Sequence, residues 1–323
     1  MKLFITGING FAGRHLARLG ATKGWQIQGS ARPGTPSRIE IDPGHEVDTV
    51  AWDLACEPFP AQALERFQPD AIVHLAAQSF AGAGGLGDDS IWQANLFGTR
   101  RLYEAVARIV PQARVLYVGT GLAYGPPHER GQKSAENDPL CPPNNYAATK
   151  SCADLLSYQA FCDPGLAIIR ARPFNHVGPG QGRRFAVASF AFQFAAMKRG
   201  LIPNRLEVGN LDSARDFTDV RDIVRGYAHL IERGRPGQAY NLGSGRPTGM
   251  RSVVDSLASL TGIQPELVLR KDFLRKSDPP ILLANGSKAK EEVDWTPQIS
   301  FAQTIKDTLD YWLSQPADVL AST

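Results

Sequence analysis

Short apolar runs alternate with helix-patterned segments through the first half of this 323-residue chain, and the alternation restricts the folds it can adopt. The apolar runs occupy residues 3–6, 25–31, 71–77, 114–119 and 166–172. The helix-patterned segments occupy residues 11–23, 61–67, 91–109 and 146–161. Strands joined through helices lie parallel with right-handed crossovers, so the pattern predicts an α/β fold with a doubly wound parallel sheet. Such sheets bind ligands at the carboxyl ends of their strands.

The second half of the chain is less regular. A helix is expected over residues 186–200, followed by short strands and two late helices. We therefore predict a sheet-bearing domain over residues 1–175 and a smaller mixed α/β substrate-binding lobe over residues 176–323. Residues 218–245 are expected to pack back on the sheet.

Charge and composition exclude several kinds of partner. The net charge is only +3 and the basic residues are dispersed, which argues against nucleic acid. The four cysteines form no C-x-x-C and the six histidines show no metal-ligand spacing, so we expect reduced thiols and no metal. No run approaches membrane-spanning length and the first residues read as a strand, so we expect an untargeted cytoplasmic protein without membrane contact.

A glycine-rich segment follows the first apolar run. "ITGINGFAGRHLA" places Gly7, Gly10 and Gly13 three residues apart, with Phe11 and Ala12 at the start of the helix. Glycines let the backbone turn sharply and approach a pyrophosphate at the helix N-terminus. The spacing departs from G-x-G-x-x-G, and a turn that only packs is the alternative. With the strand order, the segment predicts a Rossmann-type dinucleotide-binding domain over residues 1–175.

The end of the second strand bears on which dinucleotide binds. An acidic residue there would suit the ribose hydroxyls of NAD, whereas Ser30 and Arg32 suit the extra phosphate of NADP. We predict NADP(H), with NAD(H) as the alternative if Arg32 is only a solvated loop residue. Further along, Asp53 is expected to accept a hydrogen bond from the adenine amino group, with Leu54 in the same site, unless Asp53 is an ordinary surface residue.

Tyr146 and Lys150 in "NNYAATK" lie four residues apart, on one face of an expected helix. A phenol is protonated at neutral pH and can donate a proton to a carbonyl oxygen. A nearby ammonium would ease the loss of that proton. Taken alone, the pair also fits an accidental pairing on a helix surface. Thr120, at the end of an upstream strand, adds a hydroxyl and favours a catalytic role.

At this point the chain resembles the extended short-chain dehydrogenase/reductase family, in which Ser or Thr, Tyr and Lys work with a nicotinamide cofactor. The resemblance rests on "TGINGFAG", "HLAAQS", "NLFGT", Thr120, Tyr146 and Lys150. It implies that Lys150 also holds the nicotinamide ribose, that Thr120 bonds the substrate oxygen and that Asn95 supports the helix. It further implies a homodimer formed through residues 91–109 and 146–161, although packing on the sheet explains their apolar spacing equally well. The "HLAAQS" residues are implied cofactor contacts at Leu75, Ala76 and Ala77, and substrate contacts at Gln78 and Ser79.

Three later segments resemble the substrate segments of GDP-mannose 4,6-dehydratases and GDP-6-deoxy-4-keto-mannose reductases, which implies a GDP-sugar substrate. Guanidinium groups suit diphosphate oxygens, so Arg215 and Arg275 form the expected anion clamp. The other implied substrate residues are Asn175 at the diphosphate or sugar, Arg205 and Glu207 at the base, and Asp278 at ribose hydroxyls. Each could instead be an exposed loop residue. "RKSDPP" departs from the family pattern at its start, which weakens the assignments of Arg275 and Asp278.

Gly121 and Leu122 stand where the dehydratases of this family carry an acid that removes the C5 proton and protonates the C6 hydroxyl. General acid–base catalysis is worth about a hundredfold to ten-thousandfold, so elimination should be negligible here. The resemblance then implies NADPH-dependent reduction of GDP-4-keto-6-deoxy-D-mannose to GDP-D-rhamnose, with the C4 epimer of the product left open. A nucleotide-sugar C4 epimerase, a GDP-mannose 4,6-dehydratase and a non-enzymatic NADP-responsive regulator are the alternatives.

Overall fold

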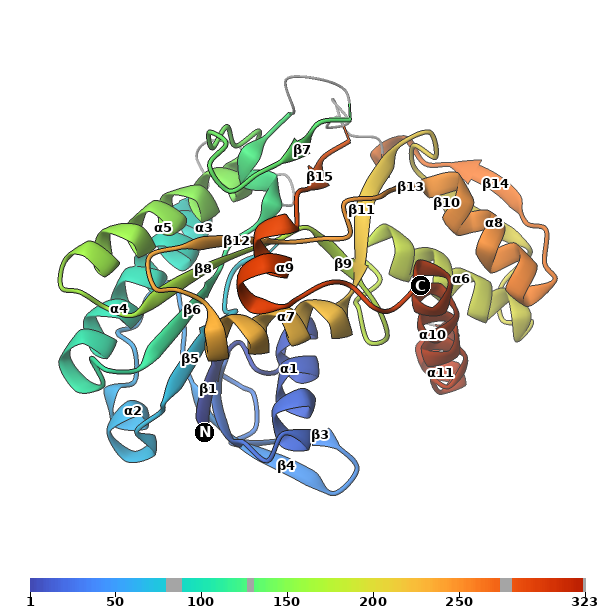
Figure 1. Cartoon of the computed structure of the whole chain (residues 1–323). Helices are drawn as coiled ribbons and strands as arrows, with labels where there is room; N and C mark the ends of the chain where they lie inside the picture. The colour runs from blue at the N-terminus through green and yellow to red at the C-terminus, as the bar shows by residue number, and fades with distance from the viewer. Residues whose placement is uncertain (80–88, 127–130, 274–280, 322–323) are drawn as a thin grey trace.

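The computed structural model describes residues 1–79, 89–126, 131–273 and 281–321. A large body carries an eight-stranded sheet in the order β12-β8-β6-β5-β1-β2-β4-β3 (Figure 1). Its strands are β1 (Lys2–Thr6), β2 (Gln26–Ala31), β3 (Arg38–Asp42), β4 (His45–Ala51), β5 (Ala71–His74), β6 (Arg114–Val118), β8 (Ile168–Pro173) and β12 (Ala239–Leu242). Neighbouring strands are parallel except for the β3–β4 pair. The predicted α/β fold with a doubly wound parallel sheet is confirmed.

Helices cover both faces of this sheet. Leu3 and Ile5 share a core with α1 (Phe11–Thr22), α7 (Val220–Arg233) and α9 (Ser287–Val293). Phe4, which lies between them on β1, belongs to a second core on the opposite face. The helices of that core are α2 (Ala61–Phe67), α4 (Gly98–Ile109) and α5 (Asn145–Cys162). Because both faces are buried, the central strands are continuously apolar instead of alternating.

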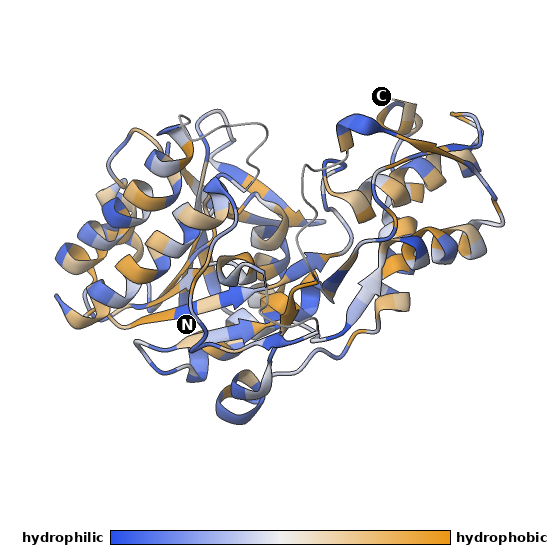
Figure 2. Ribbon diagram, turned by 90° about the horizontal axis from the view of Figure 1, so that it is seen from above, coloured by the Kyte–Doolittle hydropathy of each residue, from blue (hydrophilic) through white to orange (hydrophobic). Residues whose placement is uncertain are grey.

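The smaller lobe is packed around α6 (Ala186–Lys198), whose side chains are hydrophobic on nearly every side. Around α6 lie α8 (Met250–Thr261), α10 (Phe301–Leu313), α11 (Ala317–Ala321), and the parallel strands β10 (Arg205–Val208) and β14 (Glu266–Leu269). Figure 2 shows this lobe beside the sheet-bearing body, seen from above. Between the two run β9 (Asn175–Val177), β11 (Ala214–Asp219) and β13 (Pro247–Gly249), which pair as a small sheet, and the short pair β7 (Lys133–Ser134) and β15 (Leu283–Ala284).

The chain crosses between the two bodies more than once. β12 pairs with β8 at the edge of the large sheet, and α7 packs against α1, although both follow β11 in sequence. The division into residues 1–175 and 176–323, with residues 218–245 returning to the first, stays a prediction. Within the described ranges, no helix combines the length and apolar composition that a bilayer span requires.

Two elements differ from the pattern expected from the sequence. The expected helical segment 91–109 is helical throughout, but it is not a uniform α-helix: a π-helical turn over Gln93–Phe97 joins α3 (Asp89–Trp92) to α4. β4, which lies parallel to β2, forms an antiparallel hairpin with β3, and the turn of this hairpin contains Gly44 with φ of 75°. Ile39, Ile41 and Val47 alternate along the hairpin and bury one of its faces.

A buried ion cluster fixes α5 on the sheet. The Asp154 carboxylate on α5 accepts hydrogen bonds from Arg170 Nη1 at 2.7 Å and from Arg172 Nε and Nη2 at 3.0 and 2.9 Å. Arg172 also donates to the Tyr124 hydroxyl at 2.8 Å and to the Glu136 carbonyl at 3.0 Å. The Asp154 side chain is only 2% exposed, so loss of the carboxylate would leave buried guanidinium charge uncompensated.

Candidate active site

The predicted phosphate loop lies between β1 and the N-terminus of α1. Gly7 has φ of +69°, and a Cβ there would come within 3.0 Å of Ala76 Cα. A Cβ on Gly13 would come within 2.5 Å of the Gly7 carbonyl oxygen. Gly10 stands at the N-cap position without a side chain, so the first N–H groups of α1, at Phe11 and Ala12, can bind an anion. This cradle fits the pyrophosphate of a dinucleotide.

The residues expected near the adenosine end surround the ends of β2 and β4. The Ser30 carbonyl accepts from the N–H groups of Gly7 and Ile8 at 2.8 and 3.1 Å, so β2 supports the loop directly. Arg32 is exposed, and its charge contributes to lowering the pKa of the half-buried Asp53 carboxyl. The larger causes of that lowering are hydrogen bonds from Cys56 and Ala55. Leu54 packs against Gly98 at the start of α4.

The loop after β5 brings the next group of predicted residues beside the phosphate loop. Leu75 and Ala76 backbone atoms lie closest to Gly7, and the Ala76 N–H donates to Thr6 Oγ1 at 3.1 Å. Ala77 follows, and the Gln78 N–H donates to Asn95 Oδ1 at 2.8 Å. Ser79 Oγ accepts from Arg184 Nη2 at 3.2 Å. Residues of both bodies therefore meet at this loop.

Thr120, Tyr146 and Lys150 come together at the carboxyl end of β6. Asn144 caps α5 by accepting from the Ala147 N–H at 2.9 Å, which starts the helix just before Tyr146. Thr120 lies close enough to the Tyr146 hydroxyl to influence its pKa. Burial raises the pKa of Tyr146 to about 12, although the neighbouring Thr120 hydroxyl opposes the shift. The phenol is thus a protonated donor at neutral pH.

Lys150 is 3% exposed and lies one helical turn beyond Tyr146. Its Nζ stands 4.6 Å from the centroid of the Tyr117 ring. Burial lowers the pKa of Lys150 to about 7, and the charge of Asp154 acts in the opposite direction. A desolvated ammonium at this position responds strongly to any charge placed beside it.

Asn95 joins the loop after β5 to α5. Its Nδ2 donates to the Gln78 carbonyl at 3.2 Å and to Thr149 Oγ1 at 3.0 Å, and the Thr149 hydroxyl donates to the Tyr146 carbonyl at 2.8 Å. The π-helical turn that carries Asn95 is a feature often found at functional sites.

The residues predicted to bind substrate are more spread out. Asn175 lies opposite Phe217 in the β9–β11 register, and its Nδ2 donates to the Asp216 carbonyl at 3.5 Å. Arg215 lies on β11 and donates to the Ala214 carbonyl at 2.7 Å. On β10, Arg205 pairs with Glu266, and Glu207 pairs with Arg270. Arg275 and Asp278 lie outside the described residues.

One residue that sequence reasoning did not single out is Asp216. It is fully buried, and its carboxylate accepts from the N–H groups of Ser244, Gly245 and Ala284, each at 2.9 Å. It thereby holds the loop after β12 and strand β15 next to Arg215. Its partners lie 28 to 68 residues away in the sequence, so no spacing pattern signals its role.

Comparison with known proteins identifies the family. The sequence model of the family described as GDP-mannose 4,6 dehydratase matches residues 4–308. The chain belongs to this family. It is 33% identical to a GDP-6-deoxy-D-mannose reductase of Pseudomonas aeruginosa, over 97% of this chain and 98% of the relative. A solved structure described as RMD from Pseudomonas aeruginosa complexed with NADPH has a TM-score of 0.83 at 31% identity, covering 97% and 99% of the two chains. A putative epimerase from Burkholderia cenocepacia has a TM-score of 0.83 at 28% identity, covering 97% and 98%.

These comparisons confirm the resemblance drawn from the sequence, including the nicotinamide-dependent enzyme class. Within this GDP-mannose 4,6-dehydratase family member, Gly121 has a specific steric surrounding. A Cβ on Gly121 would come within 2.6 Å of the Phe174 ring, so no side chain fits there as the site stands. Leu122, which follows, has no proton to exchange.

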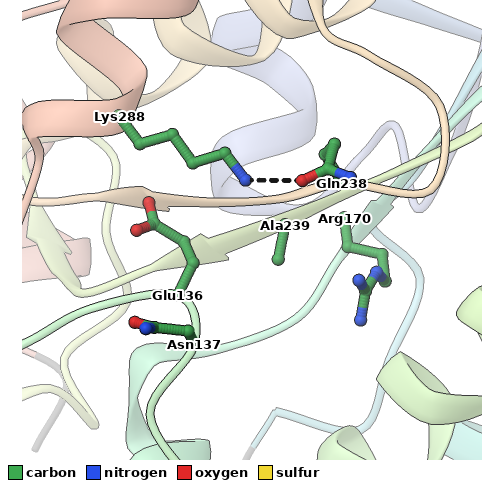
Figure 3. Close-up of a pocket in the computed structure, with 6 residues that line it drawn as sticks. All are labelled: Glu136, Asn137, Arg170, Gln238, Ala239 and Lys288. Carbon is green, nitrogen blue, oxygen red and sulfur yellow. Dashed lines mark hydrogen bonds between the residues drawn. The ribbon is translucent and has the colours of Figure 1, made fainter.

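A polar cavity of about 320 Å³ lies away from these residues (Figure 3). Its lining residues are Glu136, Asn137, Arg170, Gln238, Ala239 and Lys288. Several already bind one another or their neighbours: Lys288 Nζ donates to Gln238 Oε1 at 2.8 Å, and Glu136 Oε1 accepts from the Asn241 N–H at 2.7 Å. Among the described residues, no group of three or more His, Cys, Asp or Glu side chains is arranged to hold a metal ion.

The depressed pKa of Lys150 makes stability depend on pH. Between pH 7 and 10.5 the unfolded chain holds a proton that the folded chain has released, so the free energy of unfolding rises with pH in this window. We expect Lys150→Met to stabilise the protein without cofactor by at least about 1 kcal/mol near pH 6, with less gain near pH 9. Urea unfolding at the two pH values measures the difference. The exposed Lys198→Met is the control, and a gain that is constant with pH would contradict the expectation.

Proposed function

We propose that the protein reduces the C4 ketone of GDP-4-keto-6-deoxy-D-mannose with NADPH and forms GDP-D-rhamnose. The observation that carries the proposal is the gathering of Thr120, Tyr146 and Lys150 at the end of β6, in a site where Phe174 fills the space beside Gly121. The name of the Pseudomonas aeruginosa reductase and the NADPH complex of a similar structure support it. The same trio without a neighbouring acid suits carbonyl reduction better than elimination.

The chain's own residues handle the proton. NADPH, when bound, supplies the hydride that becomes bonded to C4. Thr120 donates a hydrogen bond that polarises the ketone oxygen, and Tyr146 gives that oxygen its proton, so that the ketone becomes an alcohol. The Lys150 ammonium lowers the cost of the phenolate left on Tyr146. The phenol then regains a proton from solvent before the next turnover.

We assign the cofactor to the sheet-bearing body and the GDP-sugar mainly to the smaller lobe. Gly7, Gly13 and the N-terminus of α1 form the pyrophosphate cradle, with Arg32 at the extra phosphate of NADPH. Arg215 and Asn175 are the assigned contacts of the sugar diphosphate. Arg205 and Glu207 would have to exchange exposed ion pairs for contacts with the base, which costs little because such pairs contribute only weakly to stability.

We further propose a cytoplasmic homodimer formed through α4 and α5. Leu155 and Tyr158 lie three residues apart on α5 and are 59% and 48% exposed, which is unusual for large side chains on a central helix. Sedimentation equilibrium measures the mass in solution, and a monomer that stays fully active would reject the proposal. Cell fractionation tests the location.

Replacement of the proton donor tests the reaction directly. A separate dehydratase generates the keto sugar, and NADPH consumption is followed after this protein is added, with GDP-mannose alone as the control substrate. We expect Tyr146→Phe to lower kcat by about a hundredfold or more, because the proton donor is lost. Tyr311→Phe removes a hydroxyl from α10 in the smaller lobe and should leave the rate unchanged.

Three results would redirect the assignment. An unchanged rate in Tyr146→Phe would reject the mechanism. Interconversion of a GDP- or UDP-hexose without added cofactor would indicate a C4 epimerase. Elimination of water from GDP-mannose would indicate a dehydratase despite Leu122.

Cofactor preference depends on one exposed guanidinium. We expect Arg32→Ala to raise KM for NADPH by about tenfold to a hundredfold, since a charge-assisted hydrogen bond to the extra phosphate is lost. KM for NADH, which has no such phosphate, should change little. Arg38→Ala removes another exposed arginine, on the β3–β4 hairpin, and serves as the control. Equal NADPH binding by wild type and Arg32→Ala would remove Arg32 from the site.

A further inference from the structure

A chain of buried polar side chains runs through the interior behind the candidate active site. Thr6, His74, Thr99 and Asn95 are each at most 1% exposed, and they come from β1, β5, α4 and the π-helical turn. Thr6 Oγ1 lies 2.8 Å from His74 Nδ1, His74 Nε2 lies 2.9 Å from Thr99 Oγ1, and Thr99 Oγ1 lies 2.7 Å from the Asn95 carbonyl oxygen. We call these four residues the buried relay.

For a neutral His74 ring, the partners of the buried relay allow one arrangement of protons. A carbonyl oxygen only accepts, so the Thr99 hydroxyl donates to Asn95 and must itself accept from His74 Nε2–H. At the other end the Ala76 N–H donates to Thr6 Oγ1, and the Thr6 hydroxyl donates to the bare Nδ1 of His74. Burial and the charge of Lys150 lower the pKa of His74 to about 3, which agrees with a neutral ring.

One end of the buried relay contacts the proposed phosphate loop, and the other end contacts the helix that carries Tyr146. Thr6 immediately precedes Gly7, and its hydroxyl holds the Ala76 backbone against the phosphate loop. Asn95 at the other end bonds Gln78 and Thr149, and Thr149 bonds the carbonyl of Tyr146. The same chain of hydrogen bonds thus fixes the cofactor loop and the first turn of the catalytic helix.

We propose that His74 is a positioning residue whose neutral, Nε2-protonated imidazole sets the relative placement of the phosphate loop and Tyr146. This role rests on the proposed reductase function. His74 does not touch the substrate or the cofactor in this role. It acts through Thr99 and Asn95 on one side and through Thr6 on the other. An apolar residue of similar size could fill the space but could not fix the relative placement of the two segments.

Substitutions at Thr99 separate positioning from packing. Thr99→Val keeps the shape of the side chain but removes the hydroxyl, whereas Thr99→Ser keeps the hydroxyl. We expect Thr99→Val to lower kcat by about tenfold with a smaller change in KM for the keto sugar, and Thr99→Ser to retain most of the wild-type kcat. Thermal unfolding and NADPH titration of each variant give the folded and binding-competent fractions. If Thr99→Val only lowers the melting temperature, with unchanged kcat per folded molecule, the proposal is overturned.

The protonation state is tested without turnover, so its outcome does not depend on the substrate. Protein labelled with ¹⁵N-histidine is followed by NMR between about pH 5 and 8, where an ordinary histidine titrates. The ring resonances of His74 are assigned as those missing from His74→Gln. If that variant does not fold, they are assigned as those that shift selectively in Thr99→Val. We expect a ring with bare Nδ1 and protonated Nε2 throughout. Titration in this range, or a proton on Nδ1, overturns the proposal even if the reductase assay succeeds. Failure of wild type to consume NADPH, with this tautomer observed, would instead reject the proposed function.

Discussion

The contact between Asp154 and two arginines of β8 decides where α5, the helix that carries Tyr146 and Lys150, lies. Parallel sheets offer many ways to dock a helix, because their apolar faces are nearly uniform. A carboxylate that accepts three hydrogen bonds from Arg170 and Arg172 removes that freedom at one point along α5. Tyr146 and Lys150 lie two turns and one turn before Asp154, so their distances to β6 follow from this contact. The buried charge also partly offsets the desolvation of Lys150.

The candidate site lies at the edge of the large sheet where strands from distant parts of the sequence end. β1, β5 and β6 deliver Gly7, Ala76 and Thr120, and α5 adds Tyr146 from outside the sheet. Hydrogen bonds, more than apolar packing, join these ends, since each loop would otherwise leave buried backbone groups without partners. Thr6, Asn95 and Asp216 serve the backbone in this way. Polar residues that do no chemistry themselves thus hold much of the site.

Sequence reasoning was most successful where short-range spacing carries the information. The strand and helix alternation, the three glycines and the Tyr146–Lys150 spacing predicted the fold and the family. The β3–β4 hairpin was not predicted. Its apolar residues Ile39, Ile41 and Val47 alternate with polar ones on either side of a turn, whereas the predicted strands were continuous apolar runs. The π-helical turn at Asn95 has no known spacing signal. Asp216 and His74 find their partners through contacts between remote segments, which spacing cannot show, and the substrate roles of Arg205 and Glu207 stay predictions.

The packing of Phe174 on Gly121 also bears on how chains of this kind could change their chemistry. An acid at position 121 would meet the ring of Phe174, so a single codon change there meets a steric block. Acquisition of an acid at that position would need a smaller residue at 174 first, and the intermediate would carry a cavity next to Gly121. Position 122 lacks this block. An aromatic ring that takes part in neither reaction therefore closes position 121 to an acid and leaves position 122 as the open one.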